Sequence, residues 1–279
     1  MNGGKLGLIA GSGRFPLLVA EEARRNRVEV VALGIPGVTD KNLADVVGQV
    51  HYFKLGQLEK PISFLRQAVV KRAVMAGKVQ HASLFGGIMP DLRAARLLTR
   101  LSDKRTDTIL KAVADEFAKD GIELLSSATY LQHLLVAEGG LTARKPNPSE
   151  AADIKLGWRA AKALAGCDIG QTVVVQDGAV IAVEAMEGTD ACVRRAGELA
   201  RSYGKTPSLT VVKVAKPNQD LRFDIPVIGL ETLKTFAEAG VSALALEAGS
   251  TLIFDKDEFL QTADARKLAI VGIKPGGPS

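Results

Sequence analysis

The chain has 279 residues, of which 47% are hydrophobic and 24% are charged, and this is ordinary composition for a globular protein with an apolar core. Its length favours two domains over one. A formal net charge of +5 suits an anionic small molecule or an anionic membrane face. No basic stripe with interleaved aromatic residues occurs, so we expect no nucleic acid among its partners.

The two cysteines, Cys167 and Cys192, form neither a CxxC motif nor a metal-binding spacing. We therefore expect reduced thiols inside the cell. The first residues, MNGGKLGLIAGSG, lack a secretory signal, and no stretch approaches about 18 uncharged apolar residues. These features predict a cytoplasmic protein and leave attachment to a membrane surface open.

Strand-like and helix-like segments alternate through the first half of the chain. The predicted strands are residues 5–11, 28–34, 51–56, 72–79 and 122–128, and the predicted helices are residues 16–27, 57–72, 90–101, 107–121 and 129–136. This alternation is typical of an α/β domain with helices on both faces of a parallel sheet. We place this domain at residues 1–138.

Residues 139–150 are rich in glycine and proline, and they are the best candidate for a linker. Beyond them the pattern changes. Helices are predicted at 149–166, opened by Ser149, and at 189–202 and 230–240. Two alternating apolar runs flank Asp177-Gly178, which is a strong hairpin signal. Residues 151–279 are therefore predicted to form an α+β domain with a mixed sheet.

A glycine-containing loop follows the first predicted strand, in the order Gly11-Ser12-Gly13, and leads to Phe15 and Pro16 at a helix start. A third glycine is missing, and the second strand lacks the acidic residue that binds a nicotinamide ribose. Backbone N–H groups at such a helix start can bind a phosphate or diphosphate, so these residues are substrate-binding candidates. A tight turn that simply needs glycine is the alternative.

Other common catalytic motifs are absent from the sequence. No G-x-S-x-G elbow occurs, and the three histidines are isolated, which argues against a serine hydrolase and against zinc. His81 follows the fourth strand, where ligands often bind, but a structural role is the commoner one. Any metal is expected to be a hard cation held by carboxylates, hence Mg²⁺ or Mn²⁺.

Charged residues gather in the segment KPNQDLRFDIP. Asp220, Arg222 and Asp224 alternate with apolar residues, which predicts an extended segment with its charges on one face. In a straight strand the two aspartates would be about 13 Å apart, too far to share one ion. A surface ladder of ion pairs is the alternative to a functional site.

A second polar cluster follows the hairpin. Glu184 precedes Glu187, Thr189 and Asp190, at the start of a predicted helix. A phosphate could bind at that helix start, with the carboxylates holding its metal, or Thr189 and Asp190 could serve as ordinary helix caps. Gln171 lies just before the hairpin and adds a polar group to the same region.

Three stretches, IAGSGRFP, DIGQTVVVQDGAVIAVEAMEGTDA and KPNQDLRFDIPVIG, occur in this order. Together they resemble the bacterial UDP-2,3-diacylglucosamine pyrophosphatases of lipid A biosynthesis, the type unrelated to calcineurin-like phosphoesterases. The resemblance implies an N-terminal Rossmann-like domain, a distinct C-terminal domain and a site between them. It also implies Mg²⁺-dependent hydrolysis of UDP-2,3-diacylglucosamine to UMP and 2,3-diacylglucosamine 1-phosphate (lipid X), with water attacking the α-phosphorus.

The resemblance identifies Asp224 as the essential residue. Diphosphate hydrolysis needs neutralised charge, a polarised phosphoryl oxygen and an oriented water. Arg222, Lys213 and Lys216 are candidates for positive charge, and Asp224, Asp190 and Glu187 for the metal. The remaining substrate-binding candidates are Gly11, Ser12, Gly13, Phe15, Pro16, Thr189, Gln219 and Gln171.

Such a substrate implies peripheral contact with the inner face of the membrane, and we also expect a homodimer. Two other classes of protein are considered. A sensor on the same fold would bind the nucleotide sugar or the lipid without catalysis. A nicotinamide-dependent oxidoreductase is disfavoured because Gly34 and Ile35 stand where the ribose-binding acid is expected.

Overall fold

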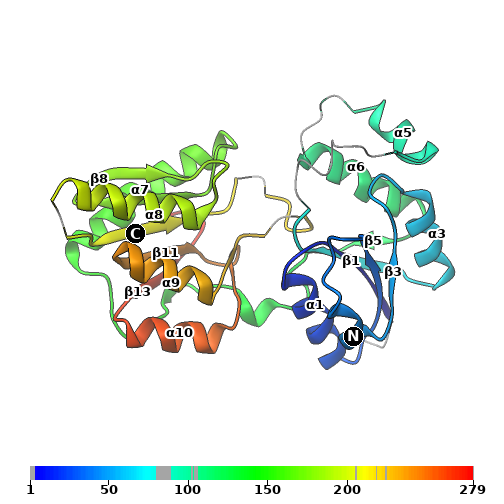
Figure 1. Ribbon diagram of the computed structural model, residues 1–279, viewed down its shortest axis with the longest axis horizontal. Helices are drawn as coiled ribbons and strands as arrows, with labels where there is room; N and C mark the ends of the chain where they lie inside the picture. Colours follow the sequence, from blue (N-terminus) through cyan, green and yellow to red (C-terminus); the bar gives the residue numbers. More distant parts are fainter. Residues whose placement is uncertain are drawn as a thin grey trace. The chain divides into compact units, whose positions relative to one another are not determined.

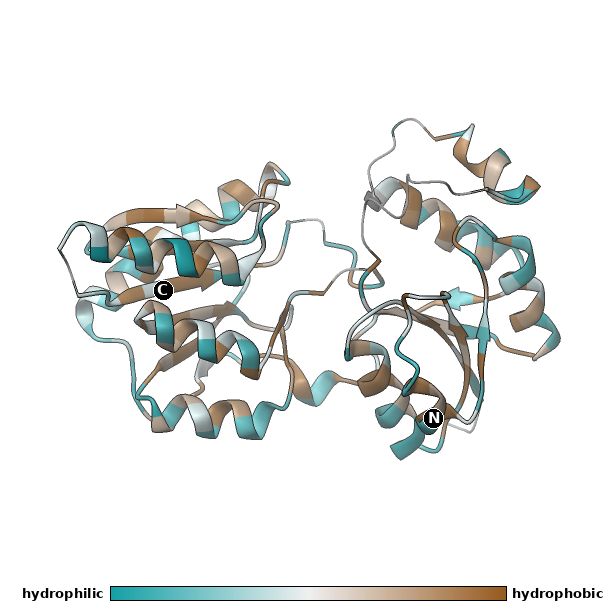
Figure 2. Cartoon of the chain, viewed as in Figure 1, coloured by the Kyte–Doolittle hydropathy of each residue, from teal (hydrophilic) through white to brown (hydrophobic). Residues whose placement is uncertain are grey.

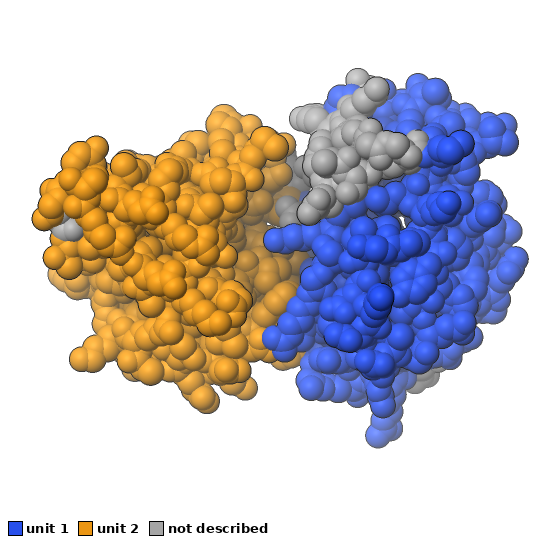
Figure 3. Space-filling view, viewed as in Figure 1, with its two compact units in different colours: residues 1–131, 220–224 blue, residues 132–219, 225–279 orange. Residues whose placement is uncertain are grey.

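The computed structural model describes the chain as two compact units (Figure 3). The described residues are 4–79, 89–101, 103, 106–204, 206–217, 219–223 and 225–278. Unit 1 comprises Met1–Leu131 together with Asp220–Asp224, and unit 2 comprises Gln132–Gln219 together with Ile225–Ser279. A short segment from late in the sequence therefore belongs to the N-terminal unit.

Unit 1 is built on a five-stranded parallel sheet in the order β3-β2-β1-β4-β5 (Figure 1). Its strands are β1 (Lys5–Ala10), β2 (Glu29–Gly34), β3 (Val50–Tyr52), β4 (Arg72–Ala76) and β5 (Glu123–Leu124). Its helices are α1 (Phe15–Arg25), α2 (Leu43–Val47), α3 (Glu59–Gln67), α5 (Leu92–Leu98) and α6 (Thr106–Lys119). This strand order is that of a Rossmann-like sheet, which confirms the predicted fold class.

The core of unit 1 follows from its apolar strands. β1 and β4 are mostly buried, and β1 lies between β2 and β4, as expected of a central parallel strand. Leu65 of α3, Phe117 of α6 and Ile122 join one apolar cluster against this sheet. The carboxyl ends of β1 and β4 lie at the same edge, where parallel folds present their functional loops.

Unit 2 contains a six-stranded mixed sheet in the order β6-β13-β11-β9-β7-β8 and a two-stranded sheet of β10 and β12. Its strands are β6 (Gly139–Gly140), β7 (Thr172–Gln176), β8 (Ala179–Val183), β9 (Leu209–Lys213), β10 (Val227–Ile228), β11 (Val241–Glu247), β12 (Leu252–Ile253) and β13 (Ala269–Ile273). Its helices are α7 (Pro148–Gly166), α8 (Thr189–Ser202), α9 (Leu230–Ala239), α10 (Lys256–Ala265) and the 3-10 turn η1 (Gln132–Leu134). The predicted mixed sheet is confirmed.

Alternation along the strands of unit 2 divides its core into two layers. Val173 and Val212 pack against Trp158 of α7, whereas Val174 and Val211 pack against α8, α9 and α10 on the other face. Since both faces are covered, these strands are apolar throughout, and they appear brown in Figure 2. The predicted hairpin is confirmed, and it turns at Asp177 and Gly178, both with positive φ.

The segment predicted as a linker, 139–150, is part of unit 2. Gly139–Gly140 forms β6 and pairs with β13. The Arg144 guanidinium donates to the carbonyls of Ser242 and Lys267 and to the carboxylate of Glu150. The structure places the boundary between the units earlier, between Leu131 and Gln132. Gly139 has a φ of +98° within β6, and Pro148 occupies the first turn of α7.

Two local predictions are wrong at the level of single elements. The predicted helix at 129–136 is reduced to η1. α7 begins at Pro148, one residue before the predicted Ser149, because Asn147 is its N-cap and forms a capping box with Glu150.

Candidate functional site

The glycine loop of unit 1 is joined to the chain that follows β4. The amide of Gly11 donates to the carbonyl of Ala76 at 2.8 Å, and the amide of Ser12 donates to the carbonyl of Lys78 at 2.8 Å. The Ser12 hydroxyl donates to the same Lys78 carbonyl at 2.8 Å. These two amides therefore donate to the chain after β4, and the substrate-binding role of Gly11 and Ser12 stays a prediction.

Close backbone approach explains the glycines at this point. A Cβ on Gly11 would lie 2.7 Å from the Lys78 carbonyl oxygen, and one on Gly77 would lie 2.6 Å from that of Ser12. Gly77 also has a φ of +92°, which side chains rarely adopt. The tight-turn alternative thus accounts for Gly11. Gly13 has a φ of +85° and open space around its Cβ position.

The start of α1 follows this loop. Phe15 is its first residue, and Pro16 occupies the favoured first turn and is buried. Arg14 is the N-cap residue and makes no side-chain capping hydrogen bond. For all five loop residues, Gly11, Ser12, Gly13, Phe15 and Pro16, substrate binding stays a prediction.

The segment 220–223 is a turn, so the predicted extended conformation is wrong. The amide of Phe223 donates to the carbonyl of Asp220 at 3.0 Å, which closes the turn. Arg222 thereby folds back on Asp220: its Nε donates to Oδ1 at 2.9 Å and its Nη2 to Oδ2 at 2.6 Å. An aspartate side chain commonly stabilises a turn by accepting hydrogen bonds from the residue two positions further along the chain. Here this local interaction prevails over the strand conformation that the alternating pattern predicted.

The ion pair fixes the charge state of both partners. Hydrogen bonding from Arg222 holds the pKa of Asp220 below its ordinary value, and Asp220 raises the pKa of Arg222. Since its Nε and Nη2 already donate to a carboxylate, Arg222 is poorly suited to grip a phosphate bidentately. The predictions for Asp224 and His81 lie outside the described residues.

A buried polar cluster lies at the end of β9 in unit 2. Lys213 Nζ donates to Thr189 Oγ1 at 2.7 Å, and Thr189 Oγ1 donates to Glu184 Oε1 at 2.9 Å. Lys213 is 8% exposed and Glu184 is 9% exposed. Because a buried lysine is costly without nearby negative charge, Thr189 and Glu184 make its position tenable. The structure therefore brings two predicted residues, Lys213 and Thr189, together at the start of α8.

Unsatisfied acceptors lie in the same part of the sequence. The amide of Gln171 approaches Glu184 Oε2 at 3.3 Å. Gln171 Oε1 and Asp190 Oδ1 are buried and, among the described residues, have no hydrogen-bond partner. Buried acceptors without donors are unusual in native proteins and suit a ligand that brings a donor or a cation.

The predicted metal ligands are not all available. The Glu187 carboxylate accepts a hydrogen bond from the backbone amide of Ala185 and another from the Arg195 guanidinium at 2.8 Å. Hydrogen bonds from its own backbone amide, from Arg195 and from the Ala185 amide lower the pKa of Glu187. Across the described residues, no three acidic, histidine or cysteine side chains group as metal ligands. Only Asp190 therefore offers a free buried carboxylate oxygen among the described candidates.

The chain that leaves β9 is fixed by side chains. Lys216 pairs with Asp168, and its amide donates to the Gln219 side chain at 2.8 Å. Two predicted residues, Lys216 and Gln219, thus meet each other. Sequence reasoning missed Glu247, a buried carboxylate at the end of β11 that accepts from Lys162 at 2.6 Å and from the Ala215 amide at 2.7 Å. A glutamate that ends an apolar strand was the available signal.

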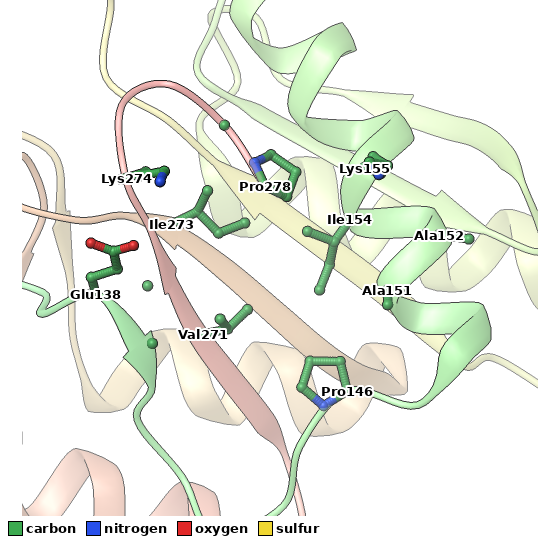
Figure 4. Close-up of a pocket in the computed structure, with 13 residues that line it drawn as sticks. Glu138, Pro146, Ala151, Ala152, Ile154, Lys155, Val271, Ile273, Lys274 and Pro278 are labelled. Atoms are coloured by element: carbon green, nitrogen blue, oxygen red, sulfur yellow. The ribbon is translucent and has the colours of Figure 1, made fainter.

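A hollow of about 550 Å³ lies elsewhere in unit 2, between α7, β6 and β13 (Figure 4). Ile154 and Lys155 of α7, Val271 and Ile273 of β13, and Pro278 are among the residues that line it. None of the predicted site residues lines this hollow.

Comparison with known proteins now identifies the chain. The LpxI N-terminal domain matches residues 5–134, and the LpxI C-terminal domain matches residues 137–271. UDP-2,3-diacylglucosamine pyrophosphatase LpxI of Caulobacter vibrioides is 32% identical over 277 residues, which cover 97% of this chain and 98% of that protein.

The chain belongs to the LpxI family. The resemblance drawn from three sequence motifs is confirmed, and so is the expectation of a hydrolytic enzyme. A second relative, the bifunctional purine biosynthesis protein PurH of Roseobacter denitrificans, is 31% identical over 136 residues, which cover 47% of this chain but 24% of that protein. No helix within the described ranges is both long and apolar enough to cross a bilayer.

Proposed function

We propose that the protein hydrolyses the diphosphate of UDP-2,3-diacylglucosamine, releasing UMP and 2,3-diacylglucosamine 1-phosphate. The observation that carries this proposal is the alignment with the Caulobacter pyrophosphatase, which extends over 97% of this chain and 98% of that protein. The coverage includes both units and every predicted site residue. A domain borrowed for another purpose would match over only part of its length.

Lys213 is the residue we assign to the substrate's negative charge. It is buried at the end of β9 and is held by Thr189, beside the first turn of α8. A buried cation and a helix N-terminus both favour a phosphate group. Gln171 and Asp190 offer buried acceptors to ligand hydroxyl or amide donors. Lys216 is assigned a lesser role because Asp168 neutralises it.

We also propose Mg²⁺ as the cofactor, with Mn²⁺ as a substitute. Asp190 offers a buried carboxylate oxygen to such an ion, whereas Glu187 is used by Arg195. The bound cation would neutralise charge on the diphosphate and polarise a phosphoryl oxygen. Across the described residues no three acidic, histidine or cysteine side chains group as metal ligands, and we propose Asp224 as a ligand because the family resemblance implies it. We propose that attack occurs at the α-phosphorus and that Asp224 orients the water.

A UMP-release assay tests the proposal. Purified protein is incubated with UDP-2,3-diacylglucosamine, with and without added Mg²⁺, and UMP is followed by chromatography. We expect turnover that EDTA abolishes and that added Mg²⁺ restores. Substrate binding without UMP release would instead support a sensor. Running the reaction in ¹⁸O-labelled water tests the site of attack, because label should appear in UMP and not in the sugar phosphate.

We further propose that the protein works as a homodimer at the inner face of the membrane. The two acyl chains of the proposed substrate and the net charge of +5 support contact with an anionic leaflet. Sedimentation with vesicles that contain anionic lipid should recover more protein than sedimentation with neutral vesicles, and the difference should decline as salt is raised.

A further inference from the structure

Ser127, in the loop that follows β5, is the buried residue from which this inference starts. It is 1% exposed. Its hydroxyl oxygen lies 2.7 Å from the carbonyl oxygen of Met75 in β4 and 3.0 Å from that of Arg222. Its amide donates to the carbonyl of Leu221 at 2.9 Å. One small side chain and its own amide therefore join the central sheet of unit 1 to the 220–223 turn.

The turn that Ser127 holds is already folded by local bonds. The Phe223 amide closes it on Asp220, and Asp220 also accepts the side chain of Arg222. The Phe223 side chain packs against the apolar cluster that contains Leu65 and Phe117. The turn is thus a compact body, and Ser127 fixes where that body lies on unit 1.

The position of the turn in the chain makes this attachment unusual. Gln219 before it and Ile225 after it both belong to unit 2, yet Asp220–Asp224 belongs to unit 1. The LpxI C-terminal domain, residues 137–271, includes this segment in sequence. Hydrogen bonds to Ser127 therefore assign a piece of the C-terminal sequence domain to the N-terminal unit.

We infer that Ser127 is a positioning residue for hydrolysis: it anchors the 220–223 turn, which immediately precedes Asp224 in the sequence, to the end of β4. The inference rests on the proposed function, in which Asp224 acts directly. A serine hydroxyl carries one proton and donates to one carbonyl at a time, so both carbonyls compete for it. Small errors in the placement of a reacting group reduce turnover strongly, by about 10²-fold per 1 Å.

Ser127→Ala tests the anchor, and Ser126→Ala is the matched control. Ser126 lies in the same loop; its hydroxyl accepts from the Ala128 amide at 3.2 Å, but it is 3.4 Å from the Leu221 carbonyl, at the limit of a hydrogen bond. We expect Ser127→Ala to lower kcat about 10- to 30-fold while KM changes less than about 3-fold, because positioning, not ground-state binding, is lost. Ser126→Ala should stay within about 3-fold of the parent in both constants.

Hydrogen exchange separates positioning from general damage. In Ser127→Ala, peptides that span 219–226 should exchange faster, while peptides from the sheet of unit 1 keep the exchange rates of the parent. Faster exchange throughout unit 1, with a fall in kcat to match, would show that Ser127 serves folding only and would overturn the inference.

A double-mutant cycle with Asp224→Asn completes the test. If Ser127 acts through Asp224, adding Ser127→Ala to Asp224→Asn should reduce the residual rate by less than about 2-fold, whereas independent effects would multiply. Multiplying effects overturn the inference. A Ser127→Ala enzyme with parental kcat beside an inactive Asp224→Asn enzyme also overturns it, and leaves the proposed function intact. An Asp224→Asn enzyme with parental activity contradicts the proposed role of Asp224 instead.

Discussion

The two units differ in the interactions that hold the chain at the carboxyl ends of their strands. In unit 1 the loops after β1 and β4 are joined by backbone amides and carbonyls, with Gly11 and Gly77 allowing their approach. In unit 2 the corresponding edge is held by buried charged side chains, chiefly Lys213, Glu184 and Glu247. The first edge therefore depends on the absence of side chains, and the second depends on charge and its compensation.

The difference decides which substitutions should matter at each edge. Changes of shape should damage the glycine loops of unit 1 and leave its electrostatics unaltered. Changes of charge at constant shape should damage the polar cluster of unit 2. The turn at 220–223 should be sensitive to changes of shape and to changes of charge, because a backbone hydrogen bond and an ion pair both close it.

Asp224→Ala is expected to have the largest effect, because this residue follows the turn directly and is the proposed acting carboxylate. We expect kcat to fall by about 10³-fold, in the range of a lost group that acts on the reacting atoms. Calorimetric titration with substrate should show Kd within about 3-fold of the parent. Turnover close to that of the parent would show that the turn serves structure alone.

Lys213→Met tests the charge of the unit 2 edge at nearly constant shape. It leaves Glu184 and Thr189 without their cation, and we expect kcat/KM to fall about 10²-fold. The control is Lys234→Met, which removes a lysine from an exposed pair with Glu231 in α9 of the same unit. The kcat/KM of this control should stay within about 2-fold of that of the parent. Equal losses in both variants would mean that general charge matters more than this site.

Gly77→Ala tests the shape of the unit 1 edge. Its φ of +92° and the 2.6 Å approach of the Ser12 carbonyl oxygen oppose any side chain. We expect a loss of about 2–3 kcal/mol in the free energy of unfolding, measured by urea denaturation with circular dichroism. Gly13 has a similar φ but open space around its Cβ position, so we expect Gly13→Ala to lower the free energy of unfolding by only about 1 kcal/mol. A smaller loss for Gly77→Ala than for Gly13→Ala would contradict the packing argument.

Glu150→Gln should show the smallest effect and a dependence on pH. Burial alone would raise the pKa of Glu150, but hydrogen bonds from Arg144, Ser242 and the Asn147 amide hold it at about 2. Because the pKa of Glu150 is lower in the folded protein than its ordinary value of 4.5, the ionised carboxylate stabilises the fold at pH values above 4.5. This contribution is lost as the pH falls from about 4.5 to about 2. Because Arg144 is partly exposed and solvent screens the ion pair, we expect Glu150→Gln to lower the free energy of unfolding by about 2 kcal/mol at pH 7.

The single tryptophan, Trp158, lies in α7 and reports on unit 2. Its fluorescence should follow urea unfolding of Glu150→Gln and of the parent. The two curves should differ at pH 7 and converge near pH 2. Glu231→Gln, at an exposed pair, should differ from the parent by less than about 0.5 kcal/mol at every pH. A difference for Glu150→Gln that persists unchanged at low pH would contradict the assignment to its carboxylate.

The sequence by itself determined the order and type of most elements. Apolar strands bounded by glycine predicted β1 and β4 closely, the Asp177-Gly178 pair predicted the hairpin, and α8 begins and ends where the pattern places it. These signals are local, because periodicity and turn chemistry act over a few residues. The three motifs also sufficed to recognise the family.

Only the tertiary structure decided how the charged residues are used. The alternation of Asp220, Arg222 and Asp224 predicts a strand, yet a local turn brings Arg222 onto Asp220. The burial of Glu184 and Glu247 was decided only when the strand ends were brought together. Ser127 lies about a hundred residues before the turn that it holds. Long-range hydrogen bonds of this kind leave no periodic trace in a sequence, because each depends on where two distant segments meet in the fold.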